Sequence, residues 1–167
     1  MHAGACATGG FDRNGGLDSR HLVRRRRAGA LIGVPTSPGI RRIRLEGVLP
    51  PPVSHYCDAV RAGDFLYISG IVAIDKDGRV VGKGDARRQA EQIFEHIKAV
   101  LAHFDADFPR VTSVLIHLTN MDDRAVINPV RVRYCGEHRP ASTLVQVASL
   151  VHPDLLVEIT CTAYLGA

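Results

Sequence analysis

The sequence has no tryptophan, and aromatic residues make up only 5% of its 167 residues. Aromatic side chains form the surfaces on which proteins stack single-stranded bases, so this composition disfavours nucleic-acid binding. No uncharged apolar run is long enough to cross a bilayer, and we therefore expect no membrane span. Hydrophobic residues reach 46%, which is enough for the core of one globular domain.

Several familiar catalytic and metal-binding motifs are also missing. The chain contains no H-E-x-x-H, no G-x-S-x-G and no G-K-[ST] motif, and its four cysteines form no C-x-x-C pair. Unpaired cysteines of this kind are typical of buried free thiols in a reducing compartment. We therefore expect a cytoplasmic protein without a metal or other cofactor.

Positive charge is concentrated at the start of the chain. Residues 1–42 hold eight Arg and two Asp, a net charge of +6, whereas residues 43–167 hold 13 Lys and Arg against 15 Asp and Glu, a net charge of −2. The first segment also lacks any helical or strand period and is predicted to be a disordered basic extension. Three alternatives remain for it: a twin-arginine export signal at Arg24–Arg27, adhesion to anionic surfaces, or a start codon assigned too early.

Residues 43–167 show regular hydrophobic patterns. Asp85 is expected to cap a helix of about five turns, because apolar residues recur there every three or four positions. Asp122 is expected to cap a second helix that reaches Tyr134. The expected strands are Ile43–Val48, Tyr56–Arg61, Phe65–Ala73, Val111–Leu118, Thr143–Ser149 and Leu155–Tyr164, with brief pairing by Arg79–Val81. This order predicts one α+β domain in which two helices cover one face of a mixed sheet.

An ordered set of short motifs then resembles a known family. The set comprises Tyr56, Gly63–Gly70, Thr119–Asp123, Asn128, Arg139–Thr143 and Leu156–Ile159. It resembles the Rid family of reactive-intermediate deaminases, also called the YjgF or UK114 family. The resemblance implies a YjgF/chorismate-mutase-like homotrimer with ligand clefts between subunits and no cofactor. It also implies hydrolysis of reactive enamines or imines, of the 2-aminoacrylate type or, from the run His152–Tyr164, of the aminomuconate type, with release of ammonia.

The resemblance assigns roles to five positions. Glu158 matches the acidic residue that helps to place the attacking water, and Tyr56 matches the family tyrosine. Ser69 and Gly70 match the strand-end pair whose hydroxyl and N–H group meet the substrate. Asn128 matches an asparagine on the second helix that lines the cleft.

One position departs from the family pattern. Active members carry an arginine in a P-x-R-[ST] segment, and its guanidinium binds the substrate carboxylate through two parallel hydrogen bonds. Ser142 occupies that position here, after Pro140. Two interpretations follow: Arg139 takes over the carboxylate, or the protein belongs to an arginine-lacking subgroup. The function is accordingly either enamine/imine deamination or non-catalytic binding of a small carboxylate metabolite.

Overall fold

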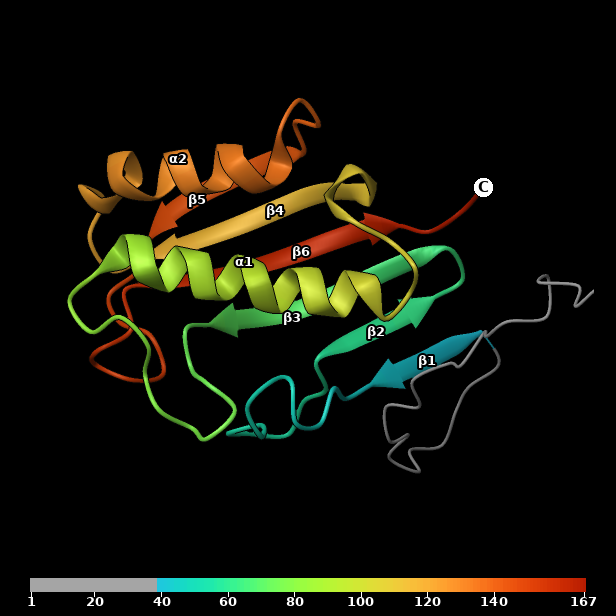
Figure 1. The fold of residues 1–167 in the computed structure, drawn as a ribbon, viewed down its shortest axis with the longest axis horizontal. Helices are drawn as coiled ribbons and strands as arrows, with labels where there is room; N and C mark the ends of the chain where they lie inside the picture. Colours follow the sequence, from blue (N-terminus) through green and yellow to red (C-terminus); the bar gives the residue numbers. More distant parts are fainter. Residues whose placement is uncertain (1–38) are drawn as a thin grey trace, which may run out of the picture.

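The computed structural model describes residues 39–167, and its strands form one six-stranded sheet (Figure 1). The sheet order is β1-β2-β3-β6-β4-β5. The elements are β1 (Ile40–Ile43), β2 (Ala59–Ala62), β3 (Phe65–Val72), α1 (Ala86–Ala102), the short 3-10 helix η2 (Phe108–Arg110), β4 (Val111–Leu118), α2 (Asp123–Cys135), β5 (Ala141–Gln146) and β6 (Val157–Tyr164). The predicted order of strands and helices is confirmed.

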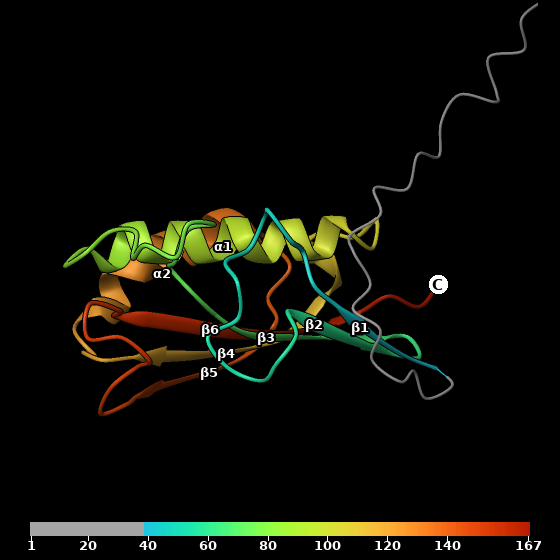
Figure 2. The same cartoon turned by 90° about the horizontal axis from the view of Figure 1, so that it is seen from below.

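The sheet is mixed, as predicted. Only the pair β4–β5 is parallel, and α2 forms the crossover between these two strands. All other neighbouring strands run antiparallel. Figure 1 shows α1 and α2 side by side, and Figure 2 shows that both lie on one face of the sheet, while no helix of residues 39–167 covers the other face. The chain is therefore a single α+β domain with one open sheet face.

The two helices begin in different ways. The Asp85 side chain accepts a hydrogen bond from the Arg88 N–H group at 3.0 Å, so the predicted cap of α1 is confirmed. Asp122 occupies the predicted N-cap position of α2, but its side chain makes no capping hydrogen bond. Instead, the Asn120 side chain accepts from the Asp122 N–H group at 3.1 Å, which satisfies one donor of the first turn.

The first strand lies earlier than predicted. Residues 40–43 form β1, and the expected strand over residues 44–48 is absent from the structure. The Asp58 carboxylate draws these residues off the sheet, because it accepts from the Leu45 N–H group at 2.6 Å and pairs with Arg44. The regular structure therefore begins three residues before the predicted boundary at residue 43. The interpretation of the basic extension falls on residues 1–38, outside the described residues.

Other strand boundaries shift by a few residues. The second strand is shorter than predicted, and β5 starts two residues before the expected Thr143. The pairing expected for Arg79–Val81 is reduced to a single bridge between Ile74 and Val80. Of the described cysteines, Cys135 and Cys161 are buried free thiols as predicted, whereas Cys57 is half-buried. Burial raises the pKa of Cys161 to about 12, so this thiol is unreactive at neutral pH.

The open face of the sheet carries exposed aromatic residues. Tyr67 is 50% exposed, and Phe65 packs edge-on against Tyr164 with their ring centroids 5.4 Å apart. Isolated exposed apolar residues are common, but a contiguous group of this kind usually marks a contact surface.

Candidate active site

A β-bulge shapes the end of β3. Ile68 pairs with Cys161, but Ile71 pairs with Ile159, so β3 contains one residue more than β6 between these pairs. The extra residue falls at Ser69-Gly70, the pair that the family resemblance predicts to contact the substrate. A bulge breaks the regular pairing and redirects nearby side chains, and such bulges are common beside active sites.

Gly70 and Glu158 are in direct contact across this bulge. A Cβ atom added to Gly70 would lie 2.9 Å from the Glu158 Cδ atom and 3.3 Å from its Cγ atom, both too close for an ordinary contact. Glu158 is half-buried on the open face of the sheet. The missing side chain at residue 70 therefore makes room for the Glu158 carboxyl group.

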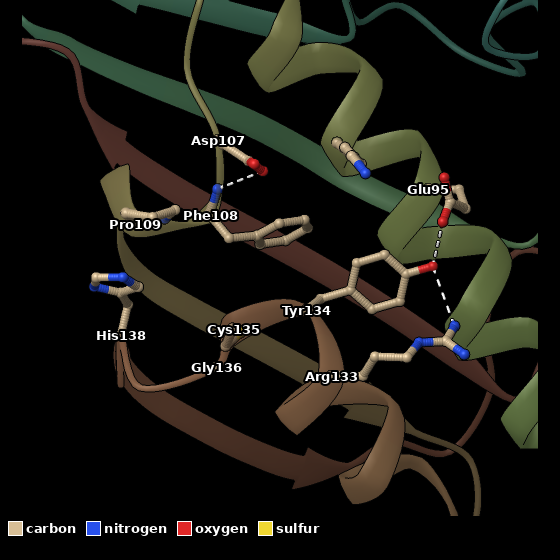
Figure 3. A pocket seen from close by; sticks show the side chains of 10 residues that line it. Glu95, Asp107, Phe108, Pro109, Arg133, Tyr134, Cys135, Gly136 and His138 are labelled. Atoms are coloured by element: carbon tan, nitrogen blue, oxygen red, sulfur yellow. Dashed lines mark hydrogen bonds between the residues drawn. The ribbon is translucent and has the colours of Figure 1, made fainter.

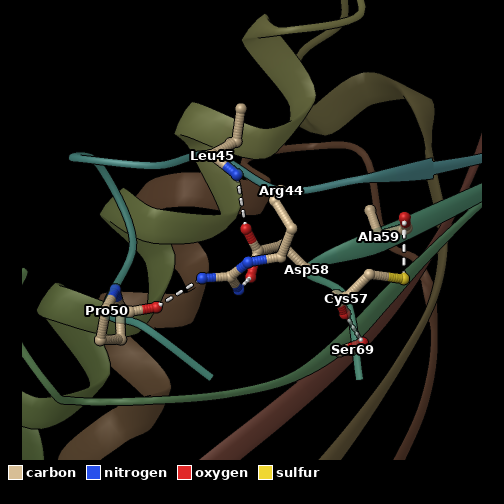
Figure 4. Close-up of polar contacts among 7 residues, drawn as sticks. All are labelled: Arg44, Leu45, Pro50, Cys57, Asp58, Ala59 and Ser69. Atoms are coloured by element: carbon tan, nitrogen blue, oxygen red, sulfur yellow. Dashed lines mark hydrogen bonds and ion pairs between the residues drawn. The ribbon is translucent and has the colours of Figure 1, made fainter. Parts of the chain in front are cut away.

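Ser69 connects the bulge to the segment that contains Tyr56 (Figure 4). Its hydroxyl donates a hydrogen bond to the Cys57 carbonyl at 2.6 Å, and its N–H group donates to the Asp58 carbonyl at 3.0 Å. The single hydroxyl proton is therefore already used, and the oxygen keeps lone pairs that can accept a hydrogen bond. Tyr56, directly before Cys57, is 43% exposed. The structure thus brings Tyr56, Ser69, Gly70 and Glu158 to one region.

His117 is a neighbour of Glu158 that the sequence analysis missed. The two residues are direct partners in the antiparallel pairing of β4 with β6, so their side chains project from the same face. The His117 Nδ1 atom is buried without a hydrogen-bond partner among the described residues. The sequence did hold a signal, because His117 stands between the buried residues Ile116 and Leu118 of a strand and must point to the other face.

The remaining predicted site residues lie across the sheet. Ser142 is registered with the buried Val114, and Leu144 with the buried Ile116, so both β5 residues face the helix layer. Asn128 of α2 lines a cavity of about 540 Å³ that Leu144 also lines. Two further arginines of α2, Arg124 and Arg131, line the same cavity and were not singled out from the sequence.

Arg139 lies apart from both groups. It is exposed in the loop between α2 and β5, and it forms no salt bridge within residues 39–167. It is also absent from the lining of the cavity that contains Asn128. Nothing in its contacts supports the interpretation that it takes over the carboxylate.

Within one chain the two groups of site residues do not meet. Glu158 lies on the open face, level with His117 and Val145 near the end of β5. Ser142 lies on the helix face, three residues earlier in that strand, which is about 10 Å along it. Glu158 and Ser142 therefore do not form one site within a single chain.

A second cavity, of about 600 Å³, lies between α1, η2 and the C-terminal end of α2 (Figure 3). Three of its polar side chains interact with one another: the Tyr134 hydroxyl donates to Glu95, and the Arg133 guanidinium lies 4.9 Å from the centre of the Tyr134 ring. None of the predicted site residues lines it. We therefore place the candidate site at the bulge and at the cavity below α2.

Residues 39–167 contain neither a metal-binding cluster nor a membrane-spanning helix. No group of three or more His, Cys, Asp or Glu side chains is arranged to hold a metal ion. No helix in this range is both long and apolar enough to cross a membrane. The expectation that the protein works without a cofactor stays a prediction.

A family model and individual relatives match this chain and point to the same family. The family model described as "Endoribonuclease L-PSP" matches residues 47–165. A RutC family protein of Pyrococcus horikoshii is 40% identical over 116 residues, which cover 69% of this chain and 90% of the relative. A protein of Acinetobacter baylyi named "3-aminoacrylate deaminase RutC" is 39% identical over 124 residues, 74% of this chain and 98% of the relative.

Solved structures agree with the sequence matches. The crystal structure of RidA from the Antarctic bacterium Psychrobacter sp. is similar with a TM-score of 0.65 and 35% identity, and the match covers 70% of this chain and 93% of that one. The family match spans most of the chain, including the bulge, the α2 cavity and Glu158. The chain therefore belongs to the Rid family, the YjgF/RutC proteins that the endoribonuclease L-PSP model describes.

Proposed function

We propose that this protein hydrolyses a reactive enamine or imine of an organic acid and releases ammonia. The observation that carries the proposal is the contact of Glu158 with Gly70 at the bulge of β3, which holds a carboxyl group beside a strand-end backbone. The relative named as a 3-aminoacrylate deaminase supports this class of reaction. Substrates of the 2-aminoacrylate or aminomuconate type fit it, and a cytoplasmic location would give access to such metabolites.

The reaction needs only water and proton transfers. Protonation of the enamine carbon gives the imine, water adds to the C=N carbon, and the resulting carbinolamine expels ammonia to leave a carbonyl group. In this proposal Glu158 holds the water and accepts its proton, which it later returns to the departing nitrogen. Holding water and imine in contact lowers the entropic barrier, and no redox step is involved.

The proposal includes a homotrimer with clefts between subunits. The Gly70–Glu158 contact and the Asn128–Leu144 cavity lie on opposite faces of the sheet, which supports an arrangement in which neighbouring copies each supply one part of a site. The exposed aromatic residues Phe65, Tyr67 and Tyr164 on the open face provide an apolar surface for that contact.

Ser142 favours a second candidate function. A serine carries no charge and offers one donor, whereas the family arginine binds a carboxylate through two charge-assisted hydrogen bonds. A protein that keeps the cleft but holds its ligand without converting it would account for this replacement. The alternative is therefore a non-catalytic protein that binds small carboxylate metabolites.

One assay separates the two functions. An amino acid oxidase acting on alanine generates 2-iminopropionate in solution, and ammonia release is followed with and without this protein. We expect a rate above the uncatalysed one, and we expect Glu158→Gln to abolish the increase while a small carboxylate still binds. Binding of the carboxylate with ammonia release at the uncatalysed rate would establish the non-catalytic alternative.

A further inference from the structure

One face of α2 carries three polar residues that point to the same cavity. Arg124, Asn128 and Arg131 are spaced by four and three residues, so they lie on one side of the helix. All three line the cavity of about 540 Å³, whose floor includes Leu144 of β5. Asn128 is thus flanked on both sides by arginines.

The lengths of β5 and α2 put Arg131 near the level of Ser142. The Met121 N–H group donates to the Gln146 side chain at 3.2 Å, which fixes the start of α2 beside the end of β5. From Gln146 back to Ser142 the strand covers about 13 Å. The same distance along an antiparallel helix corresponds to about nine residues, which from Met121 ends within one residue of Arg131.

The charge of Arg131 has no acidic partner in the described part of the chain. Neither Arg124 nor Arg131 forms a salt bridge there, whereas Arg133 on the same helix pairs with Glu91 at 3.6 Å. Arg131 is half-buried, whereas Arg124 is exposed.

We propose that Arg131 binds the carboxylate of the substrate, in place of the arginine that Ser142 replaces. Ser142 is not among the residues that line the cavity, but it lies two residues before Leu144 on the same face of β5. Its hydroxyl can donate a further hydrogen bond to a carboxylate that Arg131 holds there. Asn128 beside Arg131 offers an amide for the adjoining part of the ligand. The ligand class is a small organic acid, and the inference rests on the proposed function for the acid being an enamine or imine.

Titration calorimetry with 2-oxobutanoate, an unreactive carboxylate, tests the inference directly. We expect Arg131→Gln to weaken binding about tenfold or more, or about 1.4 kcal/mol. Arg131→Lys keeps the charge but loses the two parallel hydrogen bonds, so its affinity should lie between the two. The matched control is Arg87→Gln, which removes an exposed arginine from α1 and should leave the affinity unchanged. The neutral amide of the ligand should bind all variants equally.

A rescue variant keeps the test independent of folding defects. Ser142→Arg combined with Arg131→Gln should restore affinity for 2-oxobutanoate, because the guanidinium returns from β5. Unchanged affinity in Arg131→Gln, or no binding of 2-oxobutanoate by the unaltered protein, would overturn the inference. Loss of binding in Arg131→Gln without any ammonia release by the parent protein supports the inference and removes the deaminase proposal. Ammonia release that is unaffected by Arg131→Gln supports the deaminase proposal and overturns the inference about Arg131.

Discussion

The Glu158 carboxyl group fills the space that a side chain at Gly70 would occupy. The contact depends on the bulge, because the extra residue of β3 brings Gly70 opposite the start of β6. The position of the Glu158 carboxyl group therefore depends on the absence of a Cβ atom at Gly70 on the neighbouring strand.

Gly70→Ala should therefore remove most of the deaminase activity. The added Cβ atom displaces Glu158, and a displaced carboxylate no longer holds water beside the substrate. We expect kcat for ammonia release to fall about 100-fold, consistent with the effect of small misplacements in a catalytic site. Thermal unfolding should change much less, because Glu158 is only half-buried and its carboxyl group can move toward solvent.

A double-mutant cycle with Glu158→Ala is the control. If the substitution acts through Glu158, Gly70→Ala should have little further effect once that carboxylate is gone. Equal effects of Gly70→Ala in both backgrounds would show that the glycine serves the substrate or the strand directly.

The buried pair Arg44–Asp58 should stabilise the segment behind Ser69 (Figure 4). The side chains are 6% and 3% exposed, and Asp58 also accepts from the Leu45 N–H group. Asp58→Ala leaves a buried guanidinium without its partner and should lower the free energy of unfolding by about 3 kcal/mol. Urea unfolding at a fixed protein concentration measures this loss.

The paired replacement Arg44→Met with Asp58→Leu provides the comparison. It removes both charges and fills a similar volume, so it should be much less destabilising than Asp58→Ala. A double variant as unstable as the single one would mean that the Leu45 hydrogen bond, and not the ion pair, holds this segment.

His96 should make folding sensitive to mild acid. The residue is 5% exposed, burial lowers its pKa below 6.5, and the nearby Glu95 charge opposes that effect. The Gln92 amide lies 2.8 Å from its Nε2 atom and can only donate with its nitrogen, so this ring nitrogen must be unprotonated. The unfolded chain binds the proton first, and the free energy of unfolding should fall as pH drops from about 7 to about 5.

Two variants isolate this contribution from the other histidines. His96→Gln should flatten the dependence of unfolding free energy on pH over that interval, measured by urea titration at several pH values. His55→Gln makes the same substitution at an exposed histidine and serves as the matched control. Identical slopes for the parent and His96→Gln would contradict a lowered pKa at this position.

The order of the elements was predictable because local signals are strong where the helices form. Asp85 and the apolar stripe after it define α1 without any knowledge of the sheet. The course of residues 44–48 was not predictable, because it depends on Asp58, which is 14 residues away from Arg44. A hydrophobic run that favours a strand is overruled there by a buried ion pair.

The site shows the same division. The resemblance supplied Ser69, Gly70 and Glu158, but the register shift that joins Gly70 to Glu158 has no signature in the sequence alone. The spacing of Arg124 and Arg131 around Asn128 was present in the sequence. The sequence alone does not say which side of α2 faces the sheet. The structure shows that Arg124, Asn128 and Arg131 share a cavity with Ile116 and Leu144.

Mixing two inactive variants should restore activity if each site is shared between copies. Glu158→Ala damages the group on the open face, and Asn128→Ala damages the group on the helix face. After unfolding and refolding together in equal amounts, about a quarter of the clefts in a cyclic oligomer combine two intact halves. Ammonia release by the mixture, compared with the two variants refolded separately, measures this recovery. No recovery, or a monomer mass by light scattering, would contradict a shared site.

Ser142→Arg should raise the affinity for 2-iminopropionate and with it the rate of ammonia release at low substrate concentration. The change restores the family guanidinium on β5, and binding energy at the carboxylate can be used to orient the reacting carbon. The increase should be larger with Arg131→Gln than in the parent protein, because two guanidinium groups at one level repel and compete for the same carboxylate. Ser142→Met adds a side chain without charge and should give no increase, which separates the charge from the filling of space. A Ser142→Arg variant could fold and bind 2-oxobutanoate more tightly while ammonia release stays at the uncatalysed rate. That result would show that the missing arginine is not what limits catalysis. The protein would then be a metabolite-binding member of its family.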